Sequence, residues 1–121
     1  MSRFTYDVVN MPQTTSLGEF EQVVLLAILC VGDDAYGVSI GSAIRTRTGR
    51  DCSPGALYTT LDRLENKGLV TSRMGDPTAQ RGGRPKRFFG VTKAGLEAIT
   101  RAQRSFQQLL EGLQLPGLSY V

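Results

Sequence analysis

The order of the predicted secondary structure constrains this chain more than any other feature of its sequence. Two strand-like segments, 69–74 and 87–91, flank a stretch that is dense in turn formers, 75–84. Upstream of them, apolar residues recur with helical spacing in three segments, which are expected to form helices over 17–31, 35–48 and 54–67. Three helices followed by a two-stranded hairpin make a winged helix-turn-helix, so we predict a mainly α (α+β) fold.

Capping residues support these helix boundaries. Ser16 and Glu19 have the S-x-x-E spacing of a capping box at the start of the first helix. Asp34 can cap the second helix, and Ser53 can cap the third with Pro54 at its first position. The second helix is expected to bury Val38, Ile40 and Ile44.

The end of the chain is expected to form a long helix that Thr92 caps and Pro116-Gly117 ends. Its apolar side chains recur at helical spacing: Leu96, Ile99, Phe106, Leu109, Leu110 and Leu113. A winged domain completes its core near residue 91, so nothing left in the chain covers the far half of this stripe. We therefore expect a homodimer, with Phe20 and Val24 of the first helix also in the interface. The alternative is that the helix folds back onto its own domain.

These boundaries divide the chain into four parts. Residues 1–15 form an N-terminal arm, 16–91 a winged helix-turn-helix DNA-binding domain, 92–115 a C-terminal dimerisation helix and 116–121 a tail.

The composition excludes several classes of protein. The chain has no histidine, which removes the usual general base and the commonest nitrogen ligand of metals. Its two cysteines are too few for a structural zinc site and indicate a reducing compartment. No stretch has the length of a signal peptide core or a membrane span. We expect a cytoplasmic protein that is no enzyme and binds no cofactor or metal, with Cys52 the one candidate for a redox-sensitive thiol.

Positive charge concentrates in the predicted hairpin. The net charge is +3, yet residues 81–93 carry five basic side chains and no acidic one. Arginines among glycines suit phosphate contacts or a narrow minor groove, so Arg81, Arg84 and Lys86 are candidate DNA contacts. The alternative is a solvated loop with no partner.

The third helix corresponds to the helix that enters the major groove in a helix-turn-helix. Its N-terminal turn lacks bulky and acidic side chains, and its outer face is polar. The candidate contacts to bases or backbone are Ser53, Gly55, Thr59, Thr60 and Arg63. The alternative is a helix face that only contacts water.

Several strings together resemble the PadR family of bacterial transcriptional regulators over about residues 17–113. They are Leu17-Gly18-Glu19-Phe20-Glu21, Tyr36-Gly37, Gly55-Ala56-Leu57-Tyr58, Lys67-Gly68-Leu69-Val70, Gly82-Gly83-Arg84-Pro85-Lys86-Arg87 and Val91-Thr92-Lys93-Ala94-Gly95. The chain departs from many members in having Phe88-Phe89 in place of tyrosines and in having no tryptophan.

The resemblance implies a homodimeric winged-helix repressor that binds an inverted repeat in double-stranded DNA. It adds Tyr36 and Tyr58 as DNA contacts. The short C-terminal part resembles the smaller PadR subfamily, some of whose members sense phenolic or multidrug-type compounds, which makes a small aromatic effector a candidate partner. The rival hypothesis is a winged-helix module that uses the same surfaces to bind another protein. The basic hairpin favours DNA, because a protein-docking wing has no need of so many uncompensated cations.

Overall fold

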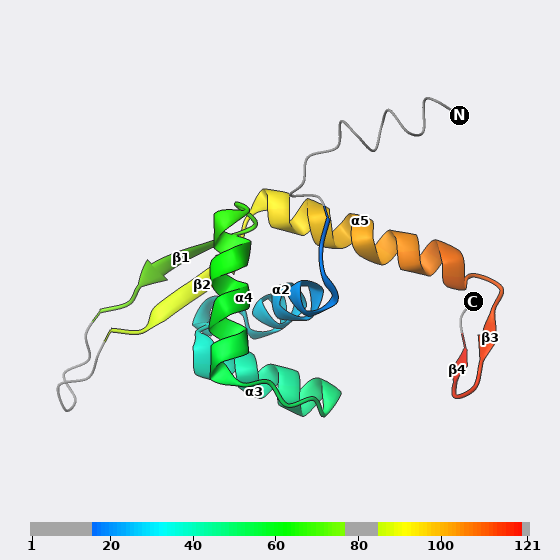
Figure 1. Cartoon of the computed structure of the whole chain (residues 1–121), viewed down its shortest axis with the longest axis horizontal. Coiled ribbons are helices and arrows are strands. Elements are labelled where there is room, and N and C mark those ends of the chain that lie inside the picture. The colour runs from blue at the N-terminus through cyan, green and yellow to red at the C-terminus, as the bar shows by residue number, and fades with distance from the viewer. Residues whose placement is uncertain (1–15, 77–84, 120–121) are drawn as a thin grey trace.

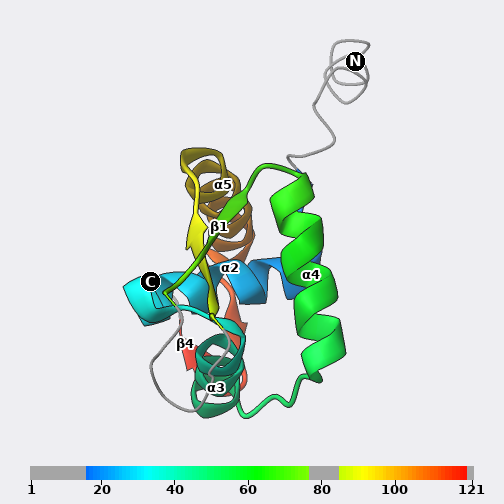
Figure 2. The same cartoon turned by 90° about the vertical axis from the view of Figure 1, so that its left-hand side faces the viewer.

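The computed structural model describes residues 16–76 and 85–119. The first helix, α2 (Glu19–Val31), occupies the centre and contacts α3, α4, α5 and β2 (Figures 1 and 2). A 3-10 turn, η2 (Gly32–Asp34), leads into α3 (Gly37–Thr48), and α4 (Pro54–Asn66) completes the helix-turn-helix. The predicted helices, hairpin and mainly helical fold are confirmed.

The wing is an antiparallel hairpin of β1 (Val70–Met74) and β2 (Arg87–Val91), with Val70 opposite Val91 and Met74 opposite Arg87. An isolated bridge between Tyr36 and Phe88 attaches β2 to the segment between η2 and α3. The Phe89 amide also donates to the Ala35 carbonyl at 2.8 Å. These bonds fix the base of the wing to the helix-turn-helix.

The core lies where the four long helices and the hairpin meet around α2. It is closed by buried aliphatic side chains and one ring: Val24, Leu25, Ile28, Ile40, Ile44, Leu57, Leu61, Leu64, Leu69, Val70, Phe89 and Ile99. Val38 was predicted in this core but is 69% exposed. The buried positions of α3 are Gly37, Ile40, Gly41 and Ile44, and Val38 falls off that face by one residue.

Two of the predicted N-caps are wrong. The first helix is capped by Gly18, whose amide donates to the Glu21 carboxylate at 2.8 Å, so the capping box lies two residues after Ser16. The second α-helix begins after Tyr36, because Asp34 belongs to the 3-10 turn and Ser39 accepts the Tyr36 amide hydrogen bond. Ser53 and Thr92 do cap their helices, through bonds from the Ala56 and Gly95 amides.

The last helix, α5 (Lys93–Leu110), is shorter than predicted. It ends before Gly112, which has a φ of 82° and a left-handed backbone that no helix can continue. Leu113 therefore lies beyond the helix, and Pro116-Gly117 forms the turn between β3 (Gln114–Leu115) and β4 (Leu118–Ser119). Figure 1 shows α5 running away from the other helices, with this small hairpin at the opposite end of the molecule from the wing.

Candidate nucleic-acid interface

The helix α4 buries one face in the core and leaves the other open. Leu57, Leu61 and Leu64 are buried, whereas Thr59 and Arg63 are exposed. Ser53 caps the helix, and residues 53–56 are all exposed, so the positive end of the helix dipole is accessible. An open polar face that ends in an unobstructed N-terminus is suited to a DNA groove.

Thr60 is a correction to the predicted DNA contacts. Its side chain is only 5% exposed, and its hydroxyl donates to the Ala56 carbonyl one turn earlier at 2.8 Å. Thr60 follows Leu57 by three residues and adjoins Leu61, which places it on the core side of the helix. A side chain held there cannot reach DNA.

Tyr58 extends from α4 back toward the first turn of α3. It is 42% exposed, and a Cβ added to Gly37 would lie 1.9 Å from the Tyr58 hydroxyl. The glycine therefore makes room for the phenol at the junction of α3 and α4. The hydroxyl lies beside the N-terminus of α3, of which Gly37 is the first residue.

Tyr36 links the start of α3 to the wing. Its ring packs edge-on against Phe88 with centroids 5.7 Å apart, and the Lys86 ammonium lies 4.4 Å from the Tyr36 ring centroid. On the neighbouring strand β1, directly opposite Phe88, the Arg73 guanidinium lies 4.8 Å from the Phe88 ring centroid. Lys86 and Arg73 are both exposed, so they keep their charge at the surface while aromatic rings limit their motion. The predicted contacts Arg81 and Arg84 lie outside the described residues.

The role of Arg87 was not predicted from the sequence, where this residue is one of the uncompensated cations of the hairpin. The guanidinium pairs with carboxylates of Asp62 and Glu65 on α4. No local signal could have revealed these contacts, because the partners lie 25 and 22 residues away in the chain. Arg73 was also missed, although it precedes the turn in a basic hairpin.

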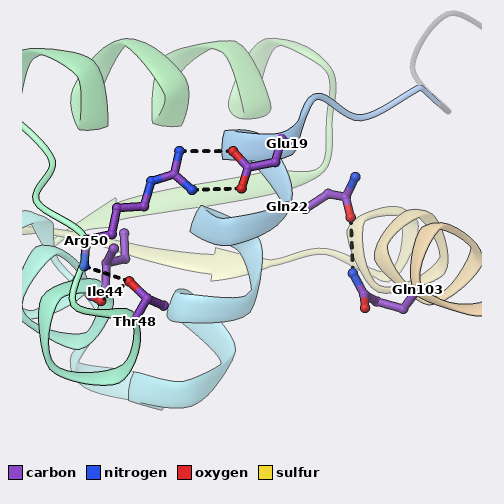
Figure 3. Close-up of polar contacts among 6 residues, drawn as sticks. All are labelled: Glu19, Gln22, Ile44, Thr48, Arg50 and Gln103. Carbon is purple, nitrogen blue, oxygen red and sulfur yellow. Dashed lines mark hydrogen bonds and ion pairs between the residues drawn. The ribbon is translucent and has the colours of Figure 1, made fainter. Parts of the chain in front are cut away.

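Two ion pairs tie the helix-turn-helix to the start of α2. The Arg50 guanidinium donates to both oxygens of Glu19 at 2.7 and 2.9 Å, as Figure 3 shows, and also covers the Phe20 ring. These hydrogen bonds lower the pKa of Glu19 and raise the pKa of Arg50. Both side chains are largely exposed, so this pair contributes position more than stability.

The second pair is more buried. Glu21 is 4% exposed, and its carboxylate accepts two bonds of 2.9 Å from the Lys67 ammonium at the end of α4. Burial alone would raise the pKa of Glu21, but the Gly18 amide and the Lys67 ammonium outweigh it and hold the pKa below its ordinary value. Lys67 also donates to the Ser16 carbonyl, so it joins α4 to the segment before α2.

The residues predicted for a dimer interface separate into two groups. Val24 and Ile99 are 0% and 4% exposed, so they belong to the core of one protomer and their assignment to an interface is wrong. Phe20 is half-buried against that core. The exposed residues are Leu96, Phe106, Leu109 and Leu113, at 44%, 55%, 74% and 48%, and Leu110 is half-buried.

The described residues contain neither a candidate metal centre nor a candidate membrane span. No three or more Asp, Glu or Cys side chains among them are placed to hold a metal ion. Within the same residues, no helix is long and apolar enough to cross a membrane. Cys30 is exposed, and Cys52 is half-buried in the loop before α4.

The fold and this surface define a winged-helix DNA-binding protein. A family model described as the transcriptional regulator PadR-like family matches residues 25–101, which is more than half of the chain. The chain belongs to this family, whose members are transcriptional regulators and not enzymes, as the sequence predicted.

Individual relatives agree with this assignment. Transcriptional regulator Rv3488 of Mycobacterium tuberculosis is 41% identical over 66 residues, which cover 53% of this chain and 56% of that protein. A PadR family transcription regulator from hypervirulent Clostridium difficile superposes with a TM-score of 0.62 at 22% identity, over 74% of this chain and 90% of that chain. F93 from STIV, a winged-helix DNA-binding protein, superposes with a TM-score of 0.65 at 17% identity, over 82% and 99%. At such identities the two structures establish the fold.

Proposed function

We propose that this regulator is a homodimeric, sequence-specific repressor that binds an inverted repeat in double-stranded DNA. Each protomer would insert α4 into the major groove, where Thr59 and Arg63 read base edges. Ser53, Gly55, Tyr36, Tyr58 and Lys86 would contact the sugar-phosphate backbone, joined by Arg81 and Arg84 of the wing. The exposed polar face of α4 beside a basic hairpin supports this arrangement.

The observation that carries the dimer is the uncovered second half of α5. The buried residues of this helix are Gly95, Ala98 and Ile99, all in its first half. Beyond them, Phe106 and Leu109 remain 55% and 74% exposed. Figure 1 shows the second half of α5 extending away from the other helices. Large apolar side chains clustered on one protruding helix are typical of an interface. A second copy presenting the same helix would cover both stripes at once.

The same helix forms a groove with α2 that suits a flat apolar effector. The groove has a volume of about 380 Å³, and its apolar lining comes from Leu26, Leu29, Leu96 and Ile99. Such a molecule would relieve repression only if it bound one spacing of the two α4 helices better than another. The Mycobacterium tuberculosis relative is a transcriptional regulator by name, which supports regulation but identifies no effector.

Selection of duplexes from a random pool, at a stated salt concentration, tests this function most directly. We expect an inverted repeat with half-sites about one helical turn apart. In transcription assays, placing the selected site over a promoter should lower transcript yield as protein is added. A pool that converges on no sequence would contradict specific binding, and raised transcript yield would contradict repression.

Phe106→Asp tests the dimer. Covering the exposed half of this ring removes on the order of 100 Å² from water, worth about 2–3 kcal/mol per copy. The variant should sediment as a monomer and lose tight binding to the selected duplex, because one protomer makes only half of the contacts. Gln108→Asp introduces the same charge on the opposite side of α5 and should remain dimeric. A dimeric Phe106→Asp protein would refute this interface.

A further inference from the structure

Arg87 lies at the base of the wing, where β1, β2 and α4 meet. As the first residue of β2, it directs its guanidinium toward α4 and pairs with Glu65 there. A second nitrogen lies 3.5 Å from the Asp62 carboxylate, and Nε donates to the Ser72 hydroxyl of β1 at 3.2 Å. Ser72 in turn donates to Glu65 at 2.9 Å, which closes the network.

The Arg87 guanidinium also packs against the buried ring of Phe89. Phe89 is 4% exposed, and the Arg87 guanidinium lies 5.0 Å from the centroid of its ring. A planar guanidinium that stacks on a ring and bonds three acceptors has little freedom to turn toward another partner. The side chain is therefore occupied on the protein side of the wing.

The network also changes the charge that α4 presents. This helix carries Asp62 and Glu65 but only one cation, Arg63. Carboxylates on a helix that approaches DNA repel phosphates unless a cation lies beside them. Among the described residues, Arg87 is the cation that pairs with Asp62 and Glu65. The neighbouring Lys86 lies over the Tyr36 ring and makes no ion pair with residues in the described part of the chain.

We propose that Arg87 is a positioning residue for DNA recognition. It sets the angle between the wing and α4 and neutralises the acidic side of α4, and it does not itself bind phosphate. This inference rests on the proposed use of α4 and the wing for specific binding. It predicts that Arg87 governs discrimination between sequences, in addition to removing a repulsion that acts on all sequences. Wing cations without carboxylate partners should change overall affinity alone.

The test compares Arg87→Gln, Glu65→Gln and the double variant on the selected duplex and a scrambled duplex at several salt concentrations. Each single variant should lower the ratio of selected to scrambled affinity by about tenfold. A change of this size lies within the range of coupling energies for residues of one ion-pair network. The double variant should lower this ratio no further than either single change, because both changes remove the same ion pair between Arg87 and Glu65. If the ratio in the double variant fell by the product of the two single-variant factors, the two residues would act independently and the proposal would be refuted.

Lys86→Gln is the matched control, since it removes the neighbouring cation. It should weaken both duplexes about equally and reduce the slope of log affinity against log salt by about one. The same behaviour in Arg87→Gln, with an unchanged ratio, would mean that Arg87 acts only through its charge and would overturn the proposal. A wild-type protein that bound both duplexes equally would contradict the proposed function. A wild-type protein that discriminates, with an unchanged ratio in Arg87→Gln, would contradict only the role of Arg87.

Arg87→Lys separates positioning from charge and from folding. Lysine keeps the charge and could replace an arginine on phosphate, but one ammonium cannot bond Glu65, Asp62 and Ser72 as a planar fork does. We expect Arg87→Lys to keep its affinity for the scrambled duplex and its thermal unfolding midpoint while losing discrimination. Full discrimination by Arg87→Lys would refute the proposal.

Discussion

Gly95 provides the sharpest test of how the winged domain is joined to α5. It is the third residue of that helix and lies directly against the end of the turn that precedes β1. A Cβ at this position would lie 2.2 Å from the Leu69 carbonyl oxygen and 2.7 Å from a methyl carbon of Val91. The first of these atoms is backbone, so no change of rotamer can relieve the contact.

The cost of Gly95→Ala follows from this geometry. Ordinary contact begins at 3.4 Å, so the start of α5 must move by about 1.2 Å from Leu69. That shift disrupts the bond from the Thr92 amide to the Leu69 carbonyl and the bond from the Thr92 hydroxyl to the Gly68 carbonyl. Overpacking costs about 1–3 kcal/mol and each lost bond about 1 kcal/mol, against a gain of up to about 1 kcal/mol in helix propensity. We expect a net loss of about 2–4 kcal/mol.

Thermal unfolding followed by circular dichroism measures this loss. A domain of this size should melt about 10 °C lower, with all proteins compared at one concentration because a dimer's midpoint depends on it. Gly55→Ala is the matched control: it lies in the first turn of α4 with no atom within 4 Å of the added Cβ, so its midpoint should stay the same or rise. A Gly95→Ala protein that melts within about 2 °C of wild type would refute the reasoning.

Other residues yield further predictions. Gly37→Ala should push the Tyr58 hydroxyl aside at a stability cost below about 1 kcal/mol, because that atom ends a partly exposed side chain. If the hydroxyl binds phosphate, filter binding should then show the same loss of DNA affinity as Tyr58→Phe, and unchanged affinity in both variants would exclude that contact. The pKa of Glu21 is lowered in the folded protein, so its stabilisation is present above the ordinary value of 4.5 and is lost as pH falls through the lower folded value. Urea midpoints between pH 7 and pH 3 should fall less steeply for Glu21→Gln than for wild type, and parallel curves would contradict the assignment.

The helices, strands and their order could be predicted from the sequence because their signals are local. Helical spacing of leucines and the Ser53-Pro54 cap depend only on neighbouring residues. The start of α2 could not be predicted, because two capping boxes overlap in the sequence. The box of Gly18 and Glu21 forms in place of that of Ser16 and Glu19, since Glu21 has the more buried tertiary contact. Glu21 both caps the helix and meets Lys67, which is 46 residues away, whereas Glu19 pairs with Arg50.

The candidate site was predictable as a surface but not residue by residue. A helical wheel places Thr59 opposite the leucine face but Thr60 at its border, about 60° from Leu57. Only the packed core shows that Thr60 turns inward. Val24 and Ile99 looked like surplus apolar residues, yet α2 is covered on several sides and α5 packs on it. Charge along the chain likewise shows where cations cluster but not which of them a distant carboxylate pairs with, as Arg87 illustrates.

The helix α4 is held to its protomer at three separate points. Arg50 joins the loop before it to Glu19, and Lys67 joins its C-cap to Glu21. Arg87 joins its C-terminal half to the wing. Two of these contacts lead to α2, and Gln22 of α2 bonds Gln103 of α5 at 3.1 Å (Figure 3). In the proposed dimer, α4 and the wing would therefore follow α2 as a rigid unit. An effector in the groove between α2 and α5 would then act by changing the separation of two intact recognition surfaces, because reshaping either one requires breaking these ion pairs.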